Sequence, residues 1–90
     1  MITLERESVI STTWTHRFIN EMVDTLSKKT SSSLYITKGD SRQIAMKSVI
    51  GLLSGNFKEG DEVKIIVIGD NDTAVSNDLQ IAENLLKGEI

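Results

Sequence analysis

Few side chains of this sequence could do chemistry, and they gather at two places. The one histidine, His16, lies between Thr15 and Arg17 at the expected start of a helix, where free backbone amides and a guanidinium would favour an anion. Ser48 follows a lysine and precedes a short apolar block, so it is placed to begin a second helix. Both places also have an ordinary explanation, because exposed polar residues and capping serines are common in first helical turns.

The sequence excludes several other kinds of site. It contains no cysteine and a single histidine, which rules out disulfides, thiolate zinc sites, cysteine nucleophiles and a multi-histidine metal site within one chain. Asp70-Asn71-Asp72 imitates the start of a calcium loop, but the required glycine and glutamate do not follow. P-loop and dinucleotide fingerprints are absent from the sequence. We therefore expect neither a metal nor a cofactor.

Length and composition indicate one small domain. The chain has 90 residues, of which 39% are hydrophobic and 26% charged, so we expect a single domain over residues 1–90. The formal net charge of −3 argues against nucleic acid as a partner. The longest apolar run, Ile65–Ile68, is far too short for a membrane span, and Met1–Arg6 lacks the apolar core of a secretory signal. These features predict a cytoplasmic protein that binds no membrane.

The apolar pattern predicts the elements that position the two places. Ile2 and Leu4 alternate with polar residues and predict a strand over residues 2–10. One helical face of apolar residues predicts a helix over residues 16–29, capped by Thr13 or Thr15; its members are Phe18, Ile19, Met22, Val23 and Leu26. The rest of the pattern predicts a hairpin over 34–37 and 43–45, a short helix over 48–54, a strand over 63–68 and a helix over 73–87.

This βαββαβα order predicts an α+β fold of the open-faced sandwich type. The economical arrangement is a four-stranded antiparallel sheet with three helices on one face. We expect the first and fourth strands to form the central pair, because the helices between them must share one face. The strand over residues 63–68 is β-branched throughout, apart from Lys64, which also favours a central position.

The segment Lys47–Val63 carries a specific motif. It has a Lys-Ser start, two apolar pairs on either side of Gly51, then Ser54 and a Gly60-Asp61-Glu62 turn into a strand. Without a gap, it resembles the second half of HPr, the small phosphocarrier protein of the bacterial phosphoenolpyruvate:sugar phosphotransferase system. The resemblance implies the HPr fold for most of the chain and a place in sugar transport and carbon regulation.

The active-histidine motif of HPr is altered in this sequence. In the family, a glycine and an apolar residue precede His-Ala-Arg-Pro; here the corresponding stretch is Thr13–Phe18, which reads Thr-Trp-Thr-His-Arg-Phe. If the apolar helical face is kept in register, Arg17 matches the family arginine, Thr15 the histidine, His16 the alanine and Phe18 the proline. This alignment then requires one extra residue near Ser31–Ser33. The alternative alignment, with His16 on the family histidine, shifts the apolar face by one residue.

The resemblance implies that His16, Arg17 and Thr15 are the candidate catalytic residues. His16 would accept the phosphoryl group and Arg17 would hold its charge. One residue corresponds to about 100° of helix rotation, so His16 would point well away from the family position. An exposed polar residue is an equal alternative for His16, and an N-cap is the preferred interpretation of Thr15. At most, the protein would be a phosphoryl carrier rather than a turnover enzyme.

Ser48 is the candidate for regulatory phosphorylation. In HPr of many Gram-positive bacteria a dedicated kinase phosphorylates this serine, and the modified protein is a corepressor partner. The resemblance implies the same for Ser48, which we expect to be exposed at a helix start; the alternative is a cap with no further role.

An apolar patch resembles the one through which HPr meets its partners. The partner-binding candidates are Val49, Ile50 and Leu53 on the short helix and Asn20 and Asp24 on the first helix, with Phe18 or Met22 nearby. Some of these apolar residues must be core, so we expect only one of Val49 and Ile50 to be exposed. The acidic Asp24 argues against the usual acidic partners.

Three functional hypotheses follow from these residues. The first is a regulatory member of the family that works through Ser48, the second a phosphocarrier that uses His16, and the third an interaction domain without phosphorylation. The altered Thr15 and Phe18 positions favour the first and third, and the intact motif around Ser48 favours the first. The implied partners are phosphotransferase-system proteins or a transcriptional regulator, with HPr kinase as a further candidate.

Overall fold

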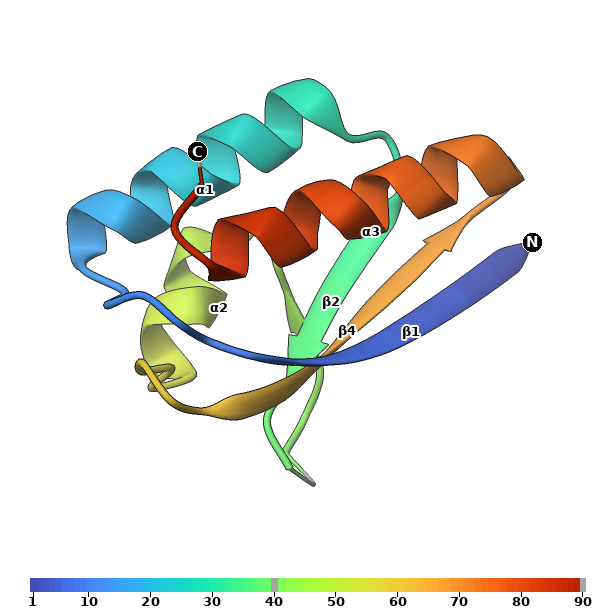
Figure 1. The fold of residues 1–90 in the computed structure, drawn as a ribbon. Helices are drawn as coiled ribbons and strands as arrows, with labels where there is room; N and C mark the ends of the chain where they lie inside the picture. The colour runs from blue at the N-terminus through green and yellow to red at the C-terminus, as the bar shows by residue number, and fades with distance from the viewer. Residues whose placement is uncertain (40, 90) are drawn as a thin grey trace.

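The structure, a computed structural model, describes residues 1–39 and 41–89 of the chain. Its elements in chain order are β1 (Ile2–Val9), α1 (His16–Lys29), β2 (Ser33–Thr37), β3 (Ile44–Ala45), α2 (Val49–Ser54), β4 (Glu62–Gly69) and α3 (Asp72–Leu86). The three helices cover one face of a four-stranded antiparallel sheet, and no helix of the described residues covers the other face (Figure 1). The α+β open-faced sandwich is therefore confirmed, with predicted boundaries within one residue for most elements.

The strand order differs from our expectation at one point. The sheet runs β1-β4-β2-β3, so β4 and β2 are central and β1 is an edge strand. The predicted central pair of first and fourth strands is wrong for β1, although β1 does pair with β4 along its whole length. The physical reason lies in the residues: β4 buries side chains on both faces, including Ile66 at 6% exposure, whereas β1 carries the exposed Glu5, Arg6 and Glu7. Charged side chains are typical of strands that must not pair further.

The core lies between the sheet and the helices, as the apolar faces predicted. Its fully or almost fully buried members include Ile19, Met22 and Leu26 of α1, Val75, Leu79, Ala82 and Leu86 of α3, and Leu34, Ile36, Ile65 and Val67 of the sheet. Burial of each large apolar side chain contributes about 1.5–3 kcal/mol. α1 packs against both α2 and α3, which fixes the first helix in relation to the short one.

A buried carboxylate fixes the loop between α1 and β2. Oδ2 of Asp78, a residue of α3 that is 4% exposed, accepts hydrogen bonds from the amides of Ser31 and Ser32 at 3.1 and 2.9 Å. From the other side, Lys47 Nζ donates to the carbonyls of Thr30 and Ser32 at 3.4 and 3.1 Å. The loop's amides thus donate to the Asp78 carboxylate, and its carbonyls accept from the Lys47 ammonium. Lys47, the residue before Ser48, is thereby hydrogen-bonded to the segment that follows α1.

Candidate functional site

Thr15 is the N-cap of α1, and His16 is the first helical residue. The Thr15 hydroxyl accepts a hydrogen bond from the Phe18 amide at 3.0 Å, so Thr15 rather than Thr13 has the capping role. The His16 imidazole is exposed. Within the described residues the amides of His16 and Arg17 have no acceptor, which leaves two free donors at this helix start.

Acidic side chains lie close to this helix start. Arg17 Nε pairs with Glu21 Oε1 at 3.2 Å along the helix, although the Arg17 side chain is 89% exposed. An exposed pair of this kind contributes at most about 1 kcal/mol, so the guanidinium can exchange partners. In addition, Thr13 Oγ1 donates to Glu59 Oε1 at 3.3 Å. This carboxylate comes from the turn before β4 and lowers the attraction of the region for anions.

Trp14, just before the cap, is a buried anchor. It is 8% exposed, and its ring lies 5.2 Å from that of Phe57 and 6.4 Å from that of Phe18, between centroids. The indole holds the segment that leads into α1 against the turn that follows α2.

Ser48 is the N-cap of α2, and its hydroxyl accepts from the Gly51 amide at 3.1 Å. The residue is half-buried, not exposed as we expected. Its hydroxyl is turned toward the Gly51 amide, where space is narrow: a Cβ at position 51 would lie 3.0 Å from Ile44 Cγ2 and 3.1 Å from Ser48 Oγ. Glycine at position 51 therefore keeps space beside the serine hydroxyl.

The exposed apolar residues of α2 are Ile50 and Leu53, at 80% and 43% exposure. Val49 is half-buried against the core, so the expectation that only one of Val49 and Ile50 is exposed is confirmed. Met22 is fully buried and cannot belong to a surface patch. Figure 1 shows α2 at the same end of the molecule as the start of α1, and the two helices are in contact.

On α1, the two polar candidates Asn20 and Asp24 are both exposed. Asp24 Oδ2 pairs with Lys28 Nζ at 3.1 Å, as the spacing of four residues allows. The charges of Arg17, Glu21, Asp24 and Lys28 are thus compensated within the helix. The α1 surface presents little uncompensated charge to a partner at these four positions.

The Gly60-Asp61-Glu62 turn of the motif is held by one carboxylate. Asp61 Oδ2 accepts from the Lys58 amide at 2.9 Å and from Lys38 Nζ at 3.1 Å. The Lys58 amide, followed by the Lys38 ammonium, lowers the pKa of Asp61 below its ordinary value. Lys38 also donates to the Asn56 carbonyl at 2.7 Å, so the end of β2 is joined to the segment that follows α2.

Three acidic residues near the two helix starts, Glu21, Glu59 and Asp78, were not predicted from the sequence. Glu21 has a usable signal, since it follows Arg17 by four residues. Glu59 lies 46 residues from Thr13 and Asp78 lies 47 residues from Ser31, so only the fold brings them together. Metal-ligating clusters of three or more His, Cys, Asp or Glu side chains do not occur in residues 1–39 and 41–89. In the same residues, no helix has both the length and the apolar character needed to span a bilayer.

Comparison with known proteins shows where the chain belongs. A family model described as the PTS HPr component phosphorylation site matches residues 11–83. Phosphocarrier protein HPr from Bacillus anthracis is similar in structure, with a TM-score of 0.80, 16% identity and coverage of 92% of this chain and 95% of that one. The histidine-containing phosphocarrier protein of a Mycoplasma gives 0.75 and 19%, over 92% and 91%.

A third similar structure is the Bacillus subtilis catabolite repression containing protein Crh. It has a TM-score of 0.65 and 18% identity, over 100% of this chain and 98% of that one. No curated protein matches the chain in a sequence comparison. At these identities the structural likenesses show the fold, while the family model covers most of the chain. This chain is a member of the HPr family.

Proposed function

We propose that this protein is a regulatory member of the HPr family that acts through phosphorylation of Ser48, with the phosphocarrier histidine displaced. The observation that carries the proposal is the contrast between two helix caps. Ser48 caps α2 within an intact family motif, whereas Thr15 caps α1 where the preferred alignment expects the phosphorylated histidine. The buried positions Ile19, Met22 and Leu26 support that alignment, because they keep the apolar face in register.

The surroundings of Ser48 suit a charge-based switch. A phosphate on its oxygen would add about −1.5 to −2 charges near pH 7, next to the Gly51 amide that the hydroxyl already accepts from. The exposed Ile50 lies two residues further on. The new charge would therefore weaken apolar docking at α2 and strengthen binding to a basic partner surface.

A second candidate function is phosphoryl transfer through His16. It is favoured by the exposed imidazole, the free amides of His16 and Arg17 and the exposed guanidinium. Against it stand the one-residue displacement and the carboxylates of Glu21 and Glu59. A protein-interaction domain that uses only Ile50 and Leu53 is the third candidate.

The partners that fit the proposal are phosphotransferase-system proteins or a transcriptional regulator, together with an HPr kinase, in the cytoplasm. The test is incubation with HPr kinase and ATP, and separately with phosphoenolpyruvate and the first enzyme of the system, with the mass of the protein measured after each. Ser48→Ala and His16→Ala are the matched variants. Phosphate from the kinase that disappears only in Ser48→Ala supports the proposal; acid-labile phosphate that disappears only in His16→Ala supports the carrier.

A further inference from the structure

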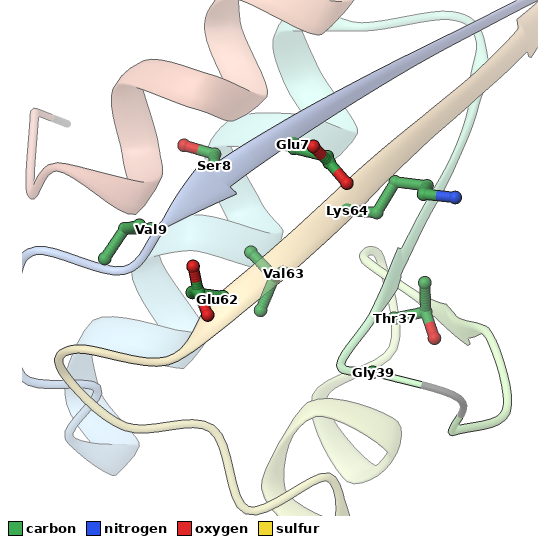
Figure 2. Close-up of a pocket in the computed structure, with 8 residues that line it drawn as sticks. All are labelled: Glu7, Ser8, Val9, Thr37, Gly39, Glu62, Val63 and Lys64. Carbon is green, nitrogen blue, oxygen red and sulfur yellow. The ribbon is translucent and has the colours of Figure 1, made fainter.

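The face of the sheet without helices carries a hollow of about 470 Å³ (Figure 2). It lies across the ends of three strands and is lined by Glu7, Val9, Thr37, Gly39, Glu62 and Lys64, among others. The strand pairing places Glu7 opposite Lys64 and Val9 opposite Glu62. These side chains point away from the helices, because their neighbours in the strands, Arg6 and Val63, face α3 and the core.

Carboxylates outnumber cations at this hollow within residues 1–39 and 41–89. Lys64 Nζ pairs with Glu5 at 3.5 Å, not with Glu7 directly across from it. Neither Glu7 nor Glu62 forms an ion pair in residues 1–39 and 41–89. Glu7 and Glu62 are diagonal neighbours on adjacent strands, and Glu7 lies directly opposite Lys64. With Glu5, the hollow and its rim hold three carboxylates and one ammonium, so this surface is net acidic.

An exposed apolar residue borders the same carboxylates. Val9 is 48% exposed, and its cross-strand neighbour is Glu62. Of the four large hydrophobic residues that are exposed in the described chain, Ile50 and Leu53 belong to α2 and Met1 is the first residue, so Val9 alone lies on this part of the sheet. An apolar contact beside uncompensated acidic groups matches the two parts of a lysine or arginine side chain, an aliphatic stem and a cationic head.

We propose that this hollow is a second docking surface, for a partner-protein segment that presents a lysine or arginine next to an apolar side chain. The cation lies between Glu7 and Glu62, and the aliphatic stem lies on Val9. The surface is on the opposite side of the sheet from the helices, so a partner bound here leaves α1 and α2 free. The proposal is independent of the role of Ser48.

The probe is the peptide acetyl-Thr-Arg-Val-Arg-Thr-amide, titrated into ¹⁵N-labelled protein while amide chemical shifts are recorded. The expected shifts concentrate on Glu7, Val9 and Lys64. The acidic peptide acetyl-Thr-Glu-Val-Glu-Thr-amide, which has the same length, is expected to cause none. Added salt should weaken the effect, because the carboxylates are exposed.

Two double variants distinguish peptide binding at this hollow from a general effect of the protein's negative charge. Glu7→Gln/Glu62→Gln should weaken peptide binding about tenfold, while the charge-matched control Asp70→Asn/Glu89→Gln should leave it within about twofold. Equal weakening by both double variants, shifts centred on α1 or α2, or no shift at about 5 mM peptide would each overturn the proposal.

Discussion

The starts of α1 and α2 lie at the same end of the molecule, and each presents a hydroxyl side chain as its cap. They differ in what surrounds the cap. At α1, free amides and an exposed guanidinium coexist with Glu21 and Glu59. At α2, the cap is half-buried beside a glycine, and the lysine before it is anchored to a neighbouring loop. The first start presents an open surface beside its cap Thr15, whereas the second holds its cap Ser48 in a half-buried, packed position.

The largest expected effect comes from placing an imidazole at the cap of α1. In Thr15→His/His16→Ala, the imidazole stands at the cap next to the free amides of α1, so phosphoenolpyruvate-dependent labelling should rise from undetectable to near one phosphate per chain. His16→Ala is the control without an imidazole. Intact mass after incubation with the first enzyme of the system measures the gain. If the variant folds and stays unlabelled, the difference between the two starts does not reside in residue 15.

The second prediction concerns the buried and the exposed side of α2. α2 has six residues, of which Leu52 is the buried one, and so short a helix is not stable on its own. Leu52→Ala should cost about 2–5 kcal/mol of unfolding free energy, whereas Ile50→Ala on the exposed side should stay within about 0.5 kcal/mol. Urea unfolding measures both. Similar losses in the two variants would contradict the separation of α2 into a core side and a docking side.

The third prediction compares the two caps directly. Thr15→Ala and Ser48→Ala should each lower the unfolding free energy by about 1 kcal/mol, because each leaves one helical amide without its acceptor. Ser48→Asp should preserve stability, since aspartate is an equally good cap. Urea unfolding of the three variants provides the measurement. A loss in Ser48→Asp as large as in Ser48→Ala would show that the half-buried cap does not tolerate a negative charge.

The smallest effect is a pH dependence of stability at the turn before β4, which carries Asp61. The pKa of Asp61 is lowered in the folded protein from an ordinary 3.8, so its stabilising contribution is present above that pH and is lost as pH falls through the lower folded pKa. Asp61→Asn should therefore destabilise the protein near neutral pH, and the difference from wild type should shrink towards about pH 2. Urea unfolding at several pH values tests this. A difference that does not vary with pH would contradict it.

Much of the fold follows from local patterns. The apolar face of α1, the caps at Thr15 and Ser48 and the β-branched run of β4 depend on short-range preferences, and the structure confirms each. The edge position of β1 could not be derived from alternation, because alternation gives the faces of a strand and not its neighbours. The adjacent charges Glu5, Arg6 and Glu7 were the available signal for an edge.

The site was less predictable than the fold, because its details depend on long-range contacts. Ile44 of β3 approaches Gly51 beside the half-buried Ser48, and Glu59 reaches Thr13 across 46 residues. The role of Asp78 could not be predicted for a different reason. It lies on the inner side of α3 among Val75, Leu79 and Ala82, where an apolar residue is usual. Its partners are backbone amides, which carry no residue-type signal.

The most direct test of a regulatory role for Ser48 is the mass of the intact protein after incubation with HPr kinase and ATP, under conditions that modify an authentic HPr. We predict one added phosphate on wild type and on His16→Ala, and none on Ser48→Ala. In the parallel reaction with phosphoenolpyruvate and the first enzyme of the system, we predict no stable labelling of wild type. Wild type that stays unmodified by the kinase, or that gains an acid-labile phosphate lost in His16→Ala, would contradict the regulatory function.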